Sequence, residues 1–267
     1  MIVATRAFRD RTRTLLWWSI AVSAMVLLIA SMFPSIAGNE ALEKMFDDMP
    51  AAVKMLAGAP EGISIVSPAG YLHSKLFALT LPLLLMIFGI GIGAHAIGGS
   101  EDDGTLELLL SNPVTRVRVA VERFVAMLAL MSVLAIVAAV TMIATNMIVG
   151  EGLDDIPVGR TVAAVGASTC VAMVHASIAF AAGCVLGRRT PAIAVAAGLA
   201  VAGYMIEGLT ATSNGLQFLG APSPWHWYLD GVIIVDGPSM ASIVLPLAVS
   251  AALAIVGIAV FVRRDLR

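Results

Sequence analysis

Charged residues are scarce in this sequence: Asp, Glu, Lys and Arg make up 13% of the 267 residues, whereas hydrophobic residues make up 59%. An ordinary soluble domain does not tolerate this balance, so the composition indicates a protein embedded in a membrane. The formal net charge of −2 excludes the basic surface that binds nucleic acid. The two cysteines, Cys170 and Cys184, share one apolar segment, lack metal-like spacing and do not indicate a redox compartment.

Motifs for catalysis and nucleotide binding are also missing. The sequence has no G-x-x-x-x-G-K-[ST] run, so the chain cannot cradle nucleotide phosphates by itself. It has no H-E-x-x-H run either, which argues against an intramembrane zinc protease, and we expect no metal site. The basic N-terminus enters the first apolar run without a small-residue cleavage site, so we expect an uncleaved anchor rather than a signal peptide.

Six apolar segments are each long enough to span a membrane. The predicted spans are residues 15–33, 76–97, 124–149, 162–186, 191–209 and 243–262. The rest of the chain is divided among loops, none longer than residues 34–75, so no soluble catalytic domain fits. We therefore expect residues 1–267 to form a single all-α integral membrane domain with six transmembrane helices.

Lys and Arg residues favour the cytoplasmic side of a membrane and set the expected orientation. With the N-terminus inside, twelve of the 16 lie in the cytoplasm: Arg6, Arg9, Arg11, Arg13, Arg116, Arg118, Arg123, Arg188, Arg189, Arg263, Arg264 and Arg267. The other four lie outside: Lys44, Lys54, Lys75 and Arg160. This imbalance predicts a multi-pass protein of the cell membrane with both termini in the cytoplasm.

Three segments outside the spans are expected to associate with the membrane. Residues 6–13 carry arginines at helical spacing, which predicts a short interfacial helix, with a frayed basic tail as the alternative. Residues 42–56 alternate apolar and charged faces, which predicts an amphipathic helix broken at Pro50. Residues 210–241 are too apolar for a solvated loop and too broken to span, so we expect re-entrant outer segments there.

The most charged run, residues 100–123, lies between the second and third predicted spans. Three of its leucines, at i, i+3 and i+4 spacing, predict one apolar stripe on a short helix: Leu106, Leu109 and Leu110. Asn112 and Pro113 are expected to end this helix and to begin the next one as its N-cap and first residue. The acids around the stripe disfavour an anionic lipid leaflet, so we expect this helix to bind another protein.

Residues 101–116 read EDDGTLE and then, from Leu109, LLSNPVTR, which resembles the first cytoplasmic loop of ABC-2 type permeases. These permeases are the membrane subunits of a large class of ATP-binding-cassette (ABC) exporters. In that family the loop is a coupling helix that sits in a cleft of a separate ATPase subunit. The resemblance places a coupling helix within residues 100–116. The implied ATPase-docking residues are Glu101, Asp102, Asp103, Gly104, Thr105, Leu106, Glu107, Leu109, Leu110, Pro113 and Arg116.

The resemblance also implies how the chain assembles. Six spans are half of the family's usual membrane domain, so we expect a second permease, identical or a sister chain, and two ATPase subunits. ATP and Mg²⁺ are expected on the ATPase, and this chain is expected to bind no cofactor and to be no enzyme. The family has an amphipathic helix before its first span and re-entrant segments between its last two, which matches the two segments expected here.

Glycines in the second and fourth spans have the G-x-x-x-G spacing that lets apolar helices approach closely. The pairs are Gly89 with Gly93 and Gly183 with Gly187. We expect these glycines to serve helix packing, and we expect the permease dimer to be buried along the second and fifth spans. The GIGIGA run that begins at Gly89 is a weak match to a dinucleotide-binding fingerprint, because no strand–turn–helix context surrounds it.

Glu207 is the only acid in any predicted span. An ionisable residue in a span is a candidate for the transport pathway. The alternative is an acid near the outer water interface that snorkels or caps the re-entrant turn, and we favour this alternative. His95 and His175 are expected to hydrogen-bond to neighbouring helices rather than to bind a ligand.

These observations predict the permease subunit of an ATP-driven exporter of a hydrophobic or amphipathic compound, with a drug or antibiotic as the first candidate. Other candidates for the exported compound are a lipid or glycan precursor and a substrate for maturation of an extracytoplasmic enzyme. An ion-coupled secondary transporter is expected to have paired carboxylates or broken helices at the midplane of the membrane, and the predicted spans contain only Glu207. A membrane-embedded enzyme is the other alternative, but the sequence shows no nucleophile–base or metal constellation.

Overall fold

The computed structural model describes residues 11–50, 53–54, 58, 62–210 and 217–265. Within these ranges the structure is helical, without β-strands, and six helices are long and apolar enough to cross a membrane, which confirms the predicted number. The six are Thr12–Ser35 (α2 and the 3-10 turn η1), Pro68–Asp102 (α5 to α7), Arg116–Val149 (α9), Val158–Leu186 (α10), Arg189–Thr210 (α11) and Met240–Arg263 (α15). The other helices are α3 (Glu40–Asp47), α8 (Thr105–Leu110), α12 (Gln217–Gly220), α13 (Pro224–Leu229) and α14 (Ile233–Asp236).

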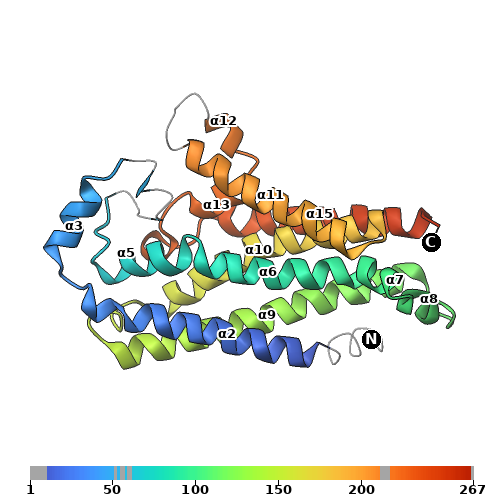
Figure 1. The fold of residues 1–267 in the computed structure, drawn as a ribbon, viewed down its shortest axis with the longest axis horizontal. Helices are drawn as coiled ribbons and strands as arrows, with labels where there is room; N and C mark the ends of the chain where they lie inside the picture. The colour runs from blue at the N-terminus through green and yellow to red at the C-terminus, as the bar shows by residue number, and fades with distance from the viewer. Residues whose placement is uncertain (1–10, 51–52, 55–57, 59–61, 211–216, 266–267) are drawn as a thin grey trace.

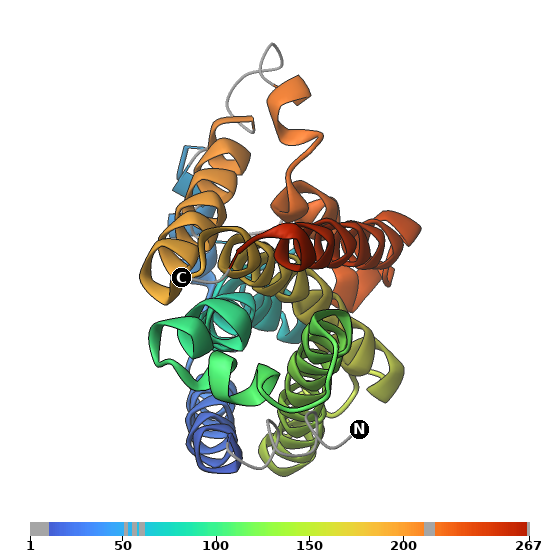
Figure 2. The same cartoon turned by 90° about the vertical axis from the view of Figure 1, so that its right-hand side faces the viewer.

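The long helices run side by side along the longest axis of the molecule, with α10 in the middle of the bundle (Figures 1 and 2). The most apolar stretch of α10 is 67% buried, whereas the corresponding stretches of α2, α11 and α15 are 22% buried. Helix α10 contacts α6 (Thr80–Ala94), α9, α11 and α15. The start of α2, α7, α8 and the C-terminus lie at one end of the bundle, as six crossings require (Figure 1).

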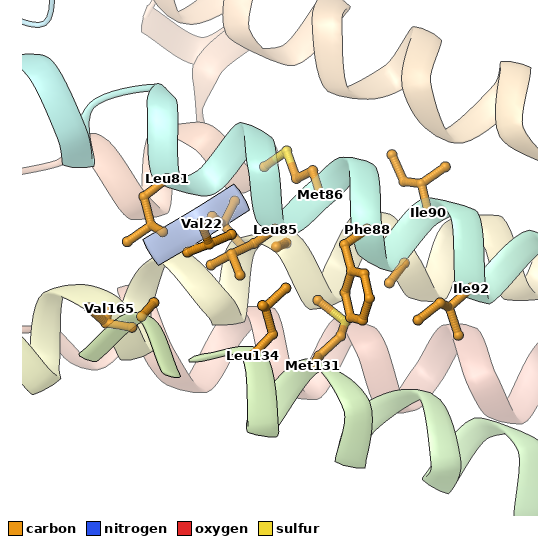
Figure 3. Close-up of a cluster of buried hydrophobic side chains, with 14 of the residues drawn as sticks. Val22, Leu81, Leu85, Met86, Phe88, Ile90, Ile92, Met131, Leu134 and Val165 are labelled. Carbon is orange, nitrogen blue, oxygen red and sulfur yellow. The ribbon is translucent and has the colours of Figure 1, made fainter. Parts of the chain in front are cut away.

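The core between α6 and α9 consists of large apolar side chains. Figure 3 shows Leu85 and Phe88 of α6 facing Met131 and Leu134 of α9. All four side chains are at most 2% exposed. Large apolar side chains on the outside of the bundle are in contrast exposed, for example Ile255 at 69%, because a membrane rather than water is the expected surrounding.

The second span is interrupted before Pro82. Helix α6 begins at Thr80 after a break at Ala78 and Leu79, and Leu79 has φ −144° and ψ −47°. A proline lacks the backbone N–H and clashes with the carbonyl group four residues before it, which here belongs to Ala78. A π turn precedes the break (η2, His73–Phe77), and a second one follows α6 (η3, His95–Gly99).

The predicted amphipathic segment in the first outer loop contains α3. Asn39 caps this helix by accepting a hydrogen bond from the Leu42 backbone N–H at 3.1 Å. The helix ends at Asp47, before Pro50, and none of its residues is buried. Residues 51–52 and 55–56 of the predicted segment, and most of the predicted N-terminal interfacial helix, lie outside the described residues.

Candidate functional site

We call residues 100–116 the coupling segment. It consists of a short α7 (Ser100–Asp102), a turn at Gly104 and then α8. Gly104 has φ +67°, a left-handed conformation that glycine adopts without the steric penalty of a Cβ. The turn therefore divides the predicted single helix into two.

The start of α9 differs from the prediction. The Asn112 side-chain amide donates to the Leu108 carbonyl oxygen at 3.1 Å, so Asn112 closes the end of α8 and does not cap α9. Thr115 is the N-cap of α9, and its hydroxyl oxygen accepts from the Arg118 backbone N–H at 3.3 Å. The predicted boundary was wrong because an Asn side chain can cap the carbonyl end of one helix as readily as the amide end of the next.

The predicted leucine stripe faces the bundle. Leu106 is fully buried, and Leu109 and Leu110 are half-buried against the hydrophobic core. Leu108, which the spacing argument left out, is 73% exposed. Leu106 is therefore covered by its own chain, and Leu108 is the leucine of α8 that its own chain leaves exposed.

The exposed face of the coupling segment, defined here as Asp103, Glu107 and Leu108, combines two carboxylates with this leucine. Gly104 and Thr105 are also exposed, and so is Pro113 after the helix. Periodicity locates the stripe but does not say whether its own bundle or a second protein covers the stripe. For this reason the sequence alone does not single out Leu108.

Two acids of the segment turn toward their own chain. Glu101 forms an ion pair with Arg264, which follows α15, and their side chains are 4% and 17% exposed. The Asp102 carboxylate accepts a hydrogen bond of 2.7 Å from the Arg189 backbone N–H at the start of α11. These acids thus contact the ends of two distant helices.

Two arginines add further contacts at the same end. Arg116 donates through Nη1 to the Arg264 carbonyl oxygen at 2.6 Å. Arg123 in α9 donates through Nη1 to the Ala96 carbonyl oxygen and to the Ser100 hydroxyl. The coupling segment is therefore joined to α9, α11 and the end of α15 by polar contacts.

The glycine pairs lie at close approaches between helices of this chain. A Cβ on Gly93 of α6 would clash with the Ala176 carbonyl oxygen of α10. Gly183 of α10 faces η3, where a Cβ would lie 3.2 Å from the Gly98 backbone nitrogen. Gly187 ends α10 with φ +65°, where a Cβ would meet Arg264 and Glu101. These glycines bring α10 against the second span, and they provide no argument for a dimer interface.

A second cluster lies at the opposite end, between α11 and α13. Glu207 of α11 is buried, with its side chain 8% exposed, and its Oε1 lies 3.1 Å from His226 Nδ1 of α13. Its Oε2 has no hydrogen-bond partner among the residues that the structure describes. Trp225 of α13 donates through Nε1 to the Ala200 carbonyl oxygen at 2.9 Å. Glu207 therefore faces α13 rather than water, and a role in the transport pathway stays a prediction.

Tyr228 attaches α13 to the second span. Its hydroxyl donates to the Phe77 carbonyl oxygen at 2.6 Å and lies 2.8 Å from the Ser168 hydroxyl of α10. Burial raises the pKa of the Tyr228 phenol, so this group remains a donor. Helices α12 to α14 thus pack on the bundle, and the expected re-entrant path through a membrane stays a prediction.

The two histidines of the spans do not behave alike. His175 Nδ1 lies 3.0 Å from the Val171 carbonyl oxygen of its own helix. The prediction that His175 hydrogen-bonds to a neighbouring helix was therefore wrong. His95 Nδ1 is buried, and none of the described residues forms a hydrogen bond with it. Across the described ranges, no three His, Cys, Asp or Glu side chains gather as metal ligands would.

The chain matches a known protein family. The sequence model of a family described as "ABC-2 family transporter protein" matches residues 1–266. The match includes all six long helices, the coupling segment and the outer helices α12 to α14. No curated protein matches the chain.

Proposed function

Because the chain belongs to the ABC-2 transporter family, we propose that it is the permease subunit of an ATP-driven exporter whose coupling segment binds the ATPase. The family makes this chain the membrane component of an ABC transporter, which works with an ABC ATPase. The exposed face of the coupling segment carries the proposal, because it presents an uncovered leucine between carboxylates beyond the ends of the spans.

The two kinds of side chain on this face have different roles in docking. Leu108 enters an apolar hollow of the ATPase and contributes affinity through burial. Asp103 and Glu107 pair with basic residues at the rim of that hollow, which steers the encounter and sets the register more than it adds affinity. Leu106 anchors α8 to the bundle, so a force on α8 reaches the spans.

The proposed assembly follows the family. Two permeases, identical or sister chains, stand side by side in the cell membrane with both termini in the cytoplasm, and two ATPases hold ATP and Mg²⁺. Closure of the ATPases moves α8 and opens a path between the permeases. The exported compound is hydrophobic or amphipathic, with a drug or antibiotic as the first candidate.

The orientation is tested with an impermeant thiol reagent on intact cells. A cysteine at Asp48, after α3, should be labelled, and a cysteine at Glu107 should be labelled only after the cells are opened. The reason is the excess of Lys and Arg at the end of the bundle that carries α8. Equal labelling of both positions in intact cells would contradict the orientation.

Docking is tested by charge reversal on the exposed face. Glu107→Lys places a cation against the basic rim of the ATPase hollow, and this repulsion lowers the affinity more than the loss of the Glu107 ion pair would. The purified permease should therefore retain little ATPase and show little ATP hydrolysis. The control is Asp154→Lys, the same charge change at an exposed residue at the other end of the molecule. Wild-type amounts of ATPase on the Glu107→Lys permease would show that this face is not the docking site.

Assays on the same purified complex distinguish an ATP-driven exporter from a secondary transporter. An exporter of this kind hydrolyses ATP only with the ATPase bound, and its transport does not need an ion gradient. Transport that collapses with an ion gradient and persists without the ATPase would instead identify a secondary transporter.

A further inference from the structure

Glu101 and Asp102 are adjacent in the sequence but contact different helices. Glu101 reaches Arg264 at the end of α15, and Asp102 reaches the first N–H of α11. The start of α11 and the end of α15 lie at the same end of the bundle as α7 and α8 (Figure 1). Helix α8 has its own contact with the core, because its Leu106 side chain is fully buried.

The contact of Asp102 gives α11 a cap that its own sequence does not supply. Helix α11 begins at Arg189, after Gly187 and Arg188, and neither of these side chains carries an oxygen that accepts a hydrogen bond. A helix begins with backbone N–H groups that lack a partner within the helix and with a partial positive charge. The Asp102 carboxylate satisfies one of these groups and complements that charge, so the start of α11 is bound to the coupling segment.

The ion pair between Glu101 and Arg264 is largely buried. The Glu101 side chain is 4% exposed and that of Arg264 is 17% exposed. Arg116 accompanies the pair by donating to the Arg264 backbone carbonyl oxygen, so two residues of the coupling segment bind Arg264. A buried charge that loses its partner is strongly unfavourable, so this contact resists separation while the helices move.

The loop between α10 and α11, residues 187–188, leaves room for these contacts. A Cβ at Gly187 would lie 2.7 Å from Glu101 Oε1 and would also meet the Arg264 guanidinium, and a Cβ at Gly98 would lie 2.8 Å from the Arg188 carbonyl oxygen. Glycines at both positions therefore let the loop between α10 and α11 lie directly against the segment.

We propose that Glu101 and Asp102 fasten the coupling segment to the cytoplasmic ends of α15 and α11, so that movement of α8 is transmitted to these helices as well as to α9. This inference rests on the proposed function, because the ATPase supplies the movement. Glu101, Asp102 and Arg264 are then positioning residues that keep α11 and α15 moving with α8. Without them, α8 would act on the bundle through the buried Leu106 and through its covalent connections to α7 and α9, with no direct link to α11 or α15.

The test measures two distances within one permease, in the complete complex with its ATPase in lipid nanodiscs. Cys170 and Cys184 are first replaced by alanine, so that nitroxide labels react only with introduced cysteines. One label replaces Ser111 at the end of α8, and the other replaces either Val262 near the end of α15 or Arg13 in α2. Distances are recorded by double electron–electron resonance without nucleotide and after trapping with ATP, Mg²⁺ and vanadate. We expect the α8–α2 distance to change and the α8–α15 distance to stay constant.

Variants of the ion pair should release α15 from α8. Glu101→Gln and Arg264→Gln should each give the α8–α15 distance a nucleotide-dependent shift on the order of 1–5 Å, the range of sliding and ratcheting helices. The charge-swapped double variant, Glu101→Arg with Arg264→Glu, should restore the constant distance. The matched control is Arg263→Gln, which removes the neighbouring exposed arginine and should leave the distance constant. A pair with a merely structural role would change yield or melting temperature without producing this shift.

Failure of this inference can be distinguished from failure of the proposed function. A wild-type permease that retains no ATPase overturns both. A wild-type complex that hydrolyses ATP while its α8–α15 distance shifts as much as its α8–α2 distance overturns only the transmission through Glu101 and Asp102. Variants that retain the ATPase and keep a constant α8–α15 distance overturn it as well.

Discussion

Truncating two leucines of α8 separately tests which side of this helix binds the ATPase. Leu106 and Leu108 are two positions apart, yet Leu106 is fully buried and Leu108 is 73% exposed. Leu106→Ala leaves a cavity in the core and should lower folding stability by about 2–5 kcal/mol. Leu108→Ala removes atoms that contact little of the chain, so stability should stay within about 0.5 kcal/mol.

The expected loss of ATPase affinity follows from the exposed fraction of Leu108. Full burial of a leucine side chain contributes about 1.5–3 kcal/mol. Because 73% of Leu108 is available to a partner, its burial in the ATPase contributes about 1–2 kcal/mol. Since about 1.4 kcal/mol corresponds to a factor of ten, Leu108→Ala should raise the Kd of the ATPase about 5- to 30-fold. Leucine and alanine have similar helix propensities, so α8 should remain helical.

The assay pairs the melting temperature of the purified permease with the equilibrium binding of the ATPase to the permease in nanodiscs. Leu106→Ala should lower the melting temperature, and the ATPase should bind the molecules that remain folded with nearly unchanged affinity. Leu108→Ala should show the opposite pattern. If Leu106→Ala weakens ATPase binding at an unchanged melting temperature and Leu108→Ala has no effect, the stripe faces the ATPase and the reasoning is refuted.

Two further predictions concern other parts of the bundle. Gly93→Ala should destabilise the permease by about 1–3 kcal/mol, because the new Cβ meets the Ala176 carbonyl oxygen, and thermal melting should detect this loss. Gly91→Ala is the control, with nothing within 4 Å of its Cβ, and an equal loss in both variants would contradict the close approach of α6 and α10. Glu207→Ala and His226→Ala should lower the melting temperature non-additively, with a coupling of about 0.5–3 kcal/mol, because the two side chains share one contact. Additive losses would show that this contact contributes nothing to the attachment of α13.

The six crossings follow from the sequence because a bilayer imposes a length on every apolar helix. About twenty apolar residues are needed to cross, and each segment that meets this requirement is a long helix in the structure. Likewise, the leucines of α8 share a side because the helical period places them there. Properties of this kind depend on neighbours within a few turns, so periodicity and length suffice to predict them.

The partners of individual side chains depend on contacts between distant segments. Glu101 and Arg264 are 163 positions apart, Asp102 and Arg189 are 87 apart, and no local pattern pairs them. The direction of the leucine stripe has the same origin, since the neighbouring helices determine which face of α8 is covered. Glu207 is a further example: its position in an apolar span was evident from the sequence, but its contact with His226 depends on how α13 folds back onto α11. Composition and spacing therefore determined which helices cross the membrane, whereas the packing of those helices against one another decided which acids bind within the chain and which remain available to a partner.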